Sequence, residues 1–200
     1  MIPATSSRTR KHAPPAVRRE QILDAAQACF AGGGYHRTTM DQIVAASGLS
    51  KGSLYWHFEN KEEMLLALFD RYVGEFFSAW GARTEEAPSV AANLRDGAAL
   101  FCEMILTKRD LAQTWLGFLE HPQARERLAA LYVTSRAALT AVFEAGIARG
   151  ELRPVPSASL AAAVTGLADG VLLQALVDET FDPVPPLRDA TDALLKGISR

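Results

Sequence analysis

The stretch "SGLSKGSLYWHFENKEEM", residues 47–64, decides the fold that this chain is expected to adopt. It contains a turn broken by glycine and then three adjacent large rings at positions 55–57. Leu54 and Phe58 lie four residues apart and therefore share one face of a helix. The rings and Lys51 cannot all share that inward face, so most of them are expected to point outward.

The residues before this stretch also predict helices. In residues 17–31 the apolar side chains recur with the i, i+3, i+4 spacing of an amphipathic helix. Three consecutive glycines then end that helix, because glycine adopts the left-handed conformation without a steric penalty. Thr38 or Thr39 caps a second helix, which Gly48 ends, and Ser50 caps a third.

Helical periodicity continues through the rest of the chain, and no run of useful length alternates as a strand would. Asn60 caps a fourth helix that runs to about residue 80, and residues 81–89 are expected to form a loop. Further helices are expected at about 88–107, 110–120, 122–149, 157–178 and 184–198. The fold is therefore predicted to be all-α, with about nine helices.

Two short helices that are joined by a tight turn and anchored by a longer first helix form a helix-turn-helix, here predicted at 39–58. The second helix of this motif lies in the major groove of DNA, with its N-terminal residues near the base edges. Outward O–H and N–H groups beside a lysine suit phosphate oxygens. Gly52 would let the helix approach the duplex closely, and Lys61 would add a charge beside the free amides of the fourth helix.

Residues from about Arg18 to Val73 resemble the DNA-binding domain of TetR-family transcriptional regulators. The resemblance is carried, in order, by "ILDAA", a phenylalanine, a glycine, "TT", "IVAASGLSKGSLYWHF" and "NKE", and it covers just over a quarter of the chain. The rest resembles the family in length, in helical content and in the "GIARGELRP" that ends a long helix. Val44 departs from the family pattern, which usually has alanine there.

This resemblance implies a homodimeric repressor whose C-terminal helices bind a small-molecule effector and form the dimer. Together with the outward face of the third helix, it assigns ten residues to double-stranded DNA: Thr38, Thr39, Ser50, Lys51, Gly52, Ser53, Tyr55, Trp56, His57 and Lys61. Structural alternatives remain open for three of them. Tyr55 and Trp56 could be partly buried against the first helix, and His57 could have a capping or packing role.

Charge is unevenly distributed along the chain. Residues 1–61 contain eight Lys and Arg against four Asp and Glu, whereas the remaining residues contain 13 basic and 19 acidic side chains. A basic head on an acidic body suggests that the head meets a polyanion. We therefore expect a flexible basic arm at 1–15, a helix-turn-helix DNA-binding domain at 16–76, and an effector-binding and dimerisation domain at 77–200.

Two features of the C-terminal part predict its partners. Residues 100–120 mix large apolar and polar side chains, as a small-molecule site does, although each could equally be core. The expected lining is Phe101, Met104, Trp115, Phe118 and Leu119. The last two helices have apolar faces that nothing later in the chain can cover, which predicts an isologous dimer. Its expected contacts are Ala162, Gly166, Gly170, Leu194 and Leu195.

Enzyme classes find little support in the sequence. The motif "GLSKG" at 48–52 matches the nucleophile elbow of hydrolases, but that motif needs a preceding strand and here a helical pattern precedes it. A di-iron helical bundle would need Glu-x-x-His pairs, which are absent. The histidines show no ligand spacing. No catalytic residue, metal or cofactor is therefore predicted.

The protein is expected to be cytoplasmic, with no membrane partner. Cys29 and Cys102 are far apart in apolar runs, so both are expected to be buried thiols in a reducing compartment. The N-terminal residues contain no apolar signal segment. The most membrane-like stretch, 158–177, carries Asp169 near its middle and is interpreted as a buried helix of a protein in water.

These observations predict a DNA-binding transcriptional regulator, a repressor that a small effector releases from a palindromic operator. Two alternatives stay open: a helical small-molecule-binding protein without DNA-binding activity, and a ligand-dependent activator.

Overall fold

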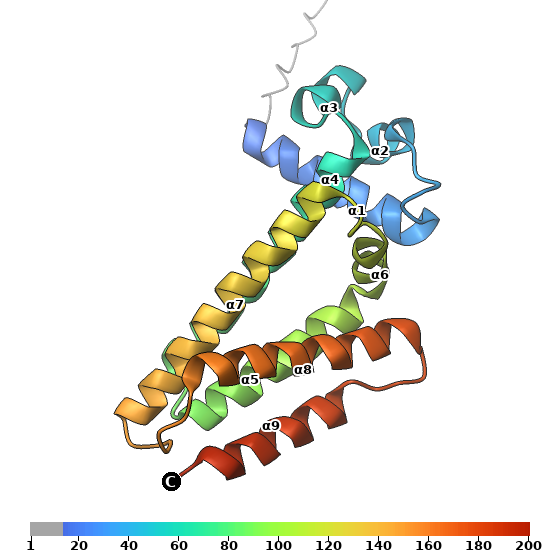
Figure 1. Ribbon diagram of the computed structural model, residues 1–200. Coiled ribbons are helices and arrows are strands. Elements are labelled where there is room, and N and C mark those ends of the chain that lie inside the picture. Colours follow the sequence, from blue (N-terminus) through green and yellow to red (C-terminus); the bar gives the residue numbers. More distant parts are fainter. Residues whose placement is uncertain (1–13) are drawn as a thin grey trace, which may run out of the picture. The chain divides into compact units, whose positions relative to one another are not determined.

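The computed structural model describes residues 14–200, which form nine helices (Figure 1). Outside these helices, one isolated antiparallel bridge joins Leu152 and Ser199. The all-α prediction is confirmed for these residues. Most of the basic arm expected at 1–15 lies outside the described residues. The chain divides into two compact units after Met64, inside the fourth helix.

The first unit is built from three helices and the start of a fourth: α1 (Pro15–Gly33), α2 (Met40–Ser47), α3 (Lys51–His57) and α4 (Lys61–Glu86). Helix α1 ends where the Gly34 backbone N–H bonds to the Phe30 carbonyl at 2.9 Å, with Gly34 at a φ of 77°. The pair Leu54 and Phe58 is buried, as its four-residue spacing predicts. With Ile43 it anchors α2 and α3 in the core of the unit.

The second unit contains the rest of α4 and five further helices: α5 (Val90–Thr107), α6 (Arg109–Gly117), α7 (Pro122–Ala148), α8 (Ser157–Val177) and α9 (Val184–Ile198). Helix α7 packs along α8, and α5 packs along α9. The main core joins residues from most of these elements: Val90, Leu94, Phe143, Leu152, Ala161, Leu195 and Ile198.

Helix α4 is longer than the sequence predicts, because it ends at Glu86 instead of near residue 80. The buried Asn93 of α5 explains the difference. Its Oδ1 accepts a hydrogen bond from Trp80 Nε1 at 3.2 Å, and its Nδ2 donates to Thr84 Oγ1 at 2.7 Å. These two bonds hold the last turns of α4, so Gly81 does not end the helix.

Helices α7 and α8 are long and apolar enough to cross a membrane, by length and composition only. The interpretation of residues 158–177 as a buried helix is wrong in one respect, because only 22% of the apolar window of α8 is buried within the chain. Leu167, Leu173 and Val177 are exposed. The second unit therefore presents apolar helix surface that its own chain does not cover.

A close approach at Gly146 leads to a prediction about the stability of the second unit. A Cβ at this position would lie 2.6 Å from Val90 Cγ2 and 2.9 Å from Leu152 Cδ1, both in the core. We expect Gly146→Ala to lower the free energy of unfolding by about 1–3 kcal/mol, the usual cost of overpacking. Urea unfolding followed by circular dichroism measures this. Gly74→Ala is the matched control, because a Cβ there meets no atom within 4 Å; equal midpoints for the two variants would contradict the prediction.

Candidate nucleic-acid interface and internal cavity

The turn between α2 and α3 is held by local capping bonds. Thr39 forms a capping box with Gln42: Gln42 N donates to Thr39 Oγ1 at 3.3 Å, and Thr39 N donates to Gln42 Oε1 at 2.8 Å. Ser50 caps α3 by accepting from Ser53 N at 3.2 Å. Gly48 lies between the helices at a φ of 66°, where a side chain would be strained. These contacts orient α3 as the second helix of a helix-turn-helix.

Helix α3 presents its large rings to solvent. Tyr55 is 43% exposed and Trp56 is 72% exposed, so burial against α1 does not describe Trp56. The half-buried His57 lies edge-on to Trp56, with ring centroids 4.5 Å apart. A Cβ added at Gly52 would meet no atom within 4 Å, so this position is open to an approaching surface. Two adjacent exposed rings on one short helix suit a surface that a binding partner covers.

Neighbouring charged groups shift the pKa values of Lys51 and His57 on this surface. Lys51 Nζ lies 2.7 Å from Asp41 Oδ1, and this hydrogen bond raises the pKa of Lys51. Partial burial lowers the pKa of His57, and the nearby Arg18 and Arg19 lower it further. Since the usual histidine pKa is already about 6.5, the imidazole is mainly neutral at pH 7. It can therefore donate one hydrogen bond and accept another.

Two of the expected DNA contacts are engaged inside the first unit. Thr38 is 4% exposed, and its hydroxyl lies 3.1 Å from the Cys29 carbonyl and 2.9 Å from the Gly34 carbonyl. Lys61 Nζ donates to the carbonyls of Tyr35, His36 and Thr38 at 2.9, 3.2 and 3.2 Å. An ammonium has three N–H donors, so a phosphate would have to displace Lys61 from this turn.

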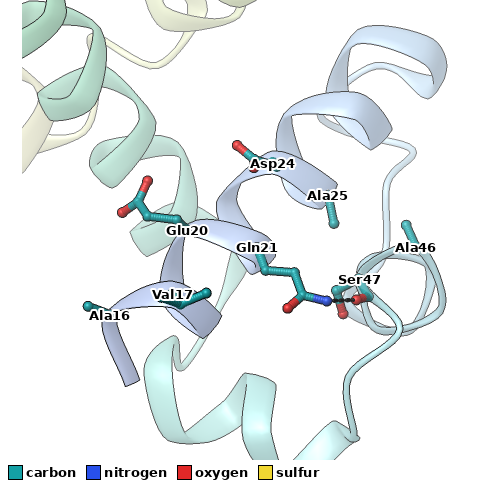
Figure 2. Close-up of a pocket in the computed structure, with 8 residues that line it drawn as sticks. All are labelled: Ala16, Val17, Glu20, Gln21, Asp24, Ala25, Ala46 and Ser47. Carbon is teal, nitrogen blue, oxygen red and sulfur yellow. Dashed lines mark hydrogen bonds between the residues drawn. The ribbon is translucent and has the colours of Figure 1, made fainter. Parts of the chain in front are cut away.

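A shallow groove on the first unit lies between the start of α1 and the end of α2 (Figure 2). Figure 2 shows Gln21 reaching across it, with Nε2 donating to the Ser47 carbonyl at 2.7 Å. The groove is open and includes the acidic side chains of Glu20 and Asp24. The bond from Gln21 fastens α1 to α2, which is a structural role.

The second unit contains a partly open cavity of about 170 Å³. Helices α4, α5, α7, α8 and α9 all contribute to its lining, which is mostly apolar and includes the rings of Phe76, Trp80 and Phe101. Asp169 of α8 and Tyr132 of α7 also line it and are hydrogen-bonded to each other. Burial raises the pKa of Asp169, and the bond from Tyr132 opposes that rise.

The expected effector residues divide between this cavity and another cluster. Phe101 and Met104 line the cavity, but Trp115, Phe118 and Leu119 do not. Trp115 stacks on Phe69 with ring centroids 3.8 Å apart, and Phe118 stacks on His121 at 4.9 Å. These rings pack with one another around α6, so their assignment to the cavity lining is corrected.

Several lining residues were missed by the sequence reasoning, notably Phe76, Trp80, Tyr132 and Asp169. Asp169 had a visible signal, since it is an acid within a long apolar run. The three aromatic residues had no such signal, because large apolar residues occur at many core positions.

The residues expected at a dimer interface are divided between the exposed surface of α8 and the interior of the second unit. Ala162, Gly166 and Gly170 are exposed on α8 at four-residue spacing. Leu194 lines the cavity instead, and Leu195 is 3% exposed within the core of its own unit. Of the five residues expected at the dimer interface, only the three on α8 are therefore exposed.

Comparison with protein families gives two matches that together span most of the chain. Residues 22–68 match the family of bacterial regulatory proteins called the tetR family. Residues 90–198 match the C-terminal domain of BetI-type transcriptional repressors, and this match alone covers more than half of the chain.

Comparison with individual proteins also finds transcriptional regulators. The transcriptional regulator YfiR of Bacillus subtilis is 26% identical over 193 residues, which cover 90% of this chain and 91% of that protein. The crystal structure of a transcriptional regulator from Saccharomonospora viridis in complex with choline superposes with a TM-score of 0.75 at 22% identity, covering 92% of this chain and 99% of that one. The SmeT–triclosan complex gives a TM-score of 0.72 at 27% identity, covering 92% of each chain.

Proposed function

This chain belongs to the TetR family of transcriptional regulators, and we propose that it is a repressor released from a palindromic operator when a small molecule occupies the cavity of its second unit. The observation that carries this proposal is the surface of α3, where exposed Tyr55 and Trp56 lie beside Lys51 on a capped helix. That surface suits phosphates and base edges. We propose that Thr39, Ser50, Gly52, Ser53 and His57 complete the DNA contact.

The cavity supports a role for a ligand. Its lining includes Val73, Phe76 and Trp80 of α4, the helix whose first residue, Lys61, holds the turn before α2. A ligand that moves α4 would therefore disturb the DNA-binding unit. DNA and effector would then oppose each other's binding to the same extent, as linkage requires. The choline and triclosan complexes of the two relatives support the idea of a small-molecule effector.

The exposed face of α8 supports a homodimer. Ala162, Gly166 and Gly170 let another backbone come close, and Leu173 and Val177 extend the same helix surface with exposed apolar side chains. A second copy of this chain would cover that surface isologously. Two copies of α3 would then meet half-sites about 34–36 Å apart, or a multiple of that spacing.

A catalytic role is not proposed, and the protein is proposed to act in the cytoplasm. The serine of "GLSKG" is Ser50, and its hydroxyl caps α3. This residue follows helix α2 instead of a strand. It therefore lacks the strained strand-to-helix turn of a nucleophile elbow. Within residues 14–200 no group of three or more His, Cys, Asp or Glu side chains could hold a metal ion.

The test is selection of DNA from a randomised duplex library by the full-length protein at two salt concentrations. We expect enrichment of a palindrome and an affinity that falls steeply with salt. Failure to enrich any sequence at either salt concentration would overturn the proposal and favour a ligand-binding protein without DNA-binding activity. A reporter gene placed behind the selected site would then separate repression from activation.

The ion pair at α2 leads to a prediction about DNA affinity. Asp41 binds the Lys51 ammonium and would repel phosphate. We expect Asp41→Asn to raise the affinity for all duplexes by about two- to fivefold for each half-site, the usual range for an exposed ion pair. Fluorescence anisotropy with the selected site measures this change. A fall in affinity would mean instead that Asp41 holds Lys51 in its binding position.

A further inference from the structure

Arg18, in the first turn of α1, differs from its neighbour Arg19 in its contacts. The Arg19 guanidinium lies 5.1 Å from the centre of the Phe58 ring and 3.5 Å from Glu20 Oε1. Because Phe58 directly follows α3, this ring contact fastens the start of α1 to the end of that helix. Within residues 14–200 the half-buried Arg18 side chain forms no hydrogen bond or ion pair. Arg18 is therefore a cation whose charge is available to an outside partner.

The position of Arg18 beside the helix-turn-helix is fixed from two sides. Besides the ring contact to the end of α3, Gln21 Nε2 donates to the Ser47 carbonyl at the end of α2, at 2.7 Å (Figure 2). Partial burial, and then the charge of Arg18, lower the pKa of His57, which is the last residue of α3. Arg18 therefore lies near the C-terminal end of α3.

The start of α1 is itself suited to an anion. No side chain caps this helix of 19 residues, and Pro15 at its first position has no N–H. The backbone N–H of Arg18 bonds to the Pro14 carbonyl at 3.2 Å, which leaves those of Ala16 and Val17 without a partner in the helix. Both residues are exposed. The positive end of the helix dipole therefore adds to the charge of Arg18.

Arg18 and Lys51 lie near opposite ends of α3. This helix runs from Lys51 to His57, and at a rise of about 1.5 Å per residue its ends are about 9 Å apart. Long cationic side chains can extend beyond both ends. The major groove of B-DNA is about 12 Å wide. Two cations in these positions therefore suit phosphates on the two sides of the groove that α3 would occupy.

We propose that Arg18, together with the amides at the start of α1, binds a backbone phosphate of the operator that Lys51 does not reach, on the opposite side of the major groove. This inference rests on the proposed function, in which α3 enters that groove, and it adds a contact from outside the helix-turn-helix. Arginine suits this contact, because its planar fork can donate two hydrogen bonds to one phosphate. A backbone contact would fix the position of α3 without selecting a base.

The first test is the salt dependence of operator binding by the full-length protein, measured by fluorescence anisotropy with the selected site. Arg18→Met should weaken binding by about threefold for each half-site, as for an exposed ion pair, and by about tenfold for a dimer. The salt slope should fall by about two, since each phosphate contact contributes about 0.9. Arg18→Lys should keep the parent slope but lose part of the affinity, because it keeps the charge without the fork. A parent slope in Arg18→Met would overturn the inference.

Arg19→Met is the matched control, because it removes the same charge from the next residue. Arg19 is engaged with Phe58 and Glu20, so this variant should keep the parent salt slope. Equal losses of slope in the two variants would mean that only the general charge of α1 matters, and would overturn the proposed contact. The unfolding temperature of Arg18→Met should equal that of the parent, which separates a lost phosphate contact from a loosened fold.

A second test locates the phosphate. Single phosphates of the selected duplex are replaced in turn by neutral methylphosphonates, and each duplex is titrated with the parent, Arg18→Met and Lys51→Met. In each half-site, Arg18→Met should be insensitive to one replacement that weakens the parent, and Lys51→Met should be insensitive to a different one across the groove. Parent sensitivity at every position in Arg18→Met, or the same position for both variants, would contradict the inference.

The same titrations let the inference fail without the proposed function. Protein that selects a palindrome, but whose Arg18→Met variant keeps the parent slope, would overturn the contact from α1 and leave the regulator intact. Parent protein that selects no DNA at either salt concentration would overturn the proposed function, and the inference with it.

Discussion

Lys51→Met is expected to weaken operator binding by about a hundredfold. The Lys51 side chain is 61% exposed at the first position of α3, where its ammonium can leave Asp41 for a phosphate. Loss of one charge-assisted hydrogen bond costs about tenfold for each half-site, and a dimer carries two copies. The salt slope of the affinity should fall by about two, since each phosphate contact contributes about 0.9. Anisotropy titrations at several salt concentrations measure both quantities.

Lys196→Met is the matched control for this experiment. It makes the same change of charge on an exposed residue of α9, in the second unit. Its salt slope should equal that of the parent. If Lys51→Met also kept the parent slope, Lys51 would not contact phosphate, and the proposed DNA-binding surface of α3 would have to be revised.

Lys61→Met is expected to loosen the first unit while leaving the salt slope nearly unchanged. The ammonium bonds to three carbonyls of the turn before α2 and lies 4.5 Å from the centre of the Tyr35 ring. Removing such a charged donor costs about 2 kcal/mol, which corresponds to about thirtyfold. Amide hydrogen exchange of residues 34–47 should speed up by that factor, because exchange reports local opening.

This expectation differs from the phosphate contact that the sequence predicts for Lys61. A phosphate contact would lower the salt slope by about two in a dimer and leave exchange in residues 34–47 at the parent rate. A structural role would leave the salt slope at the parent value and speed up exchange in residues 34–47. Lys51→Met is the control for exchange, since its partner, Asp41, is an exposed side chain and not a backbone carbonyl.

Local bonds explain why the DNA-binding unit could be predicted from the sequence. The capping bonds of α2 and α3 join residues three positions apart, Thr39 with Gln42 and Ser50 with Ser53. Each closes within one helical turn, so residue order is sufficient to predict it. Apolar spacing in the same way predicted burial for residues 54 and 58.

The cavity could not be predicted in this way. Trp115 and Phe118 are large, apolar and in the expected region, yet they stack on Phe69 and His121. Periodicity identifies which side chains face inward, but it does not distinguish a ring that fills the core from a ring that borders a cavity. That distinction depends on how five helices cross.

Residue order by itself therefore determined the all-α fold, the helix boundaries near capping residues and glycines, and the exposed aromatic face of α3. Only the tertiary structure decided that Lys61 binds carbonyls 23 to 26 positions before it, and that Asp169 of α8 meets Tyr132 of α7 inside a cavity. The physical reason is the distance along the sequence between the residues that interact. Caps and helix faces follow from neighbours within one or two turns, whereas the partners of a long side chain depend on which distant segments the folded core brings to it.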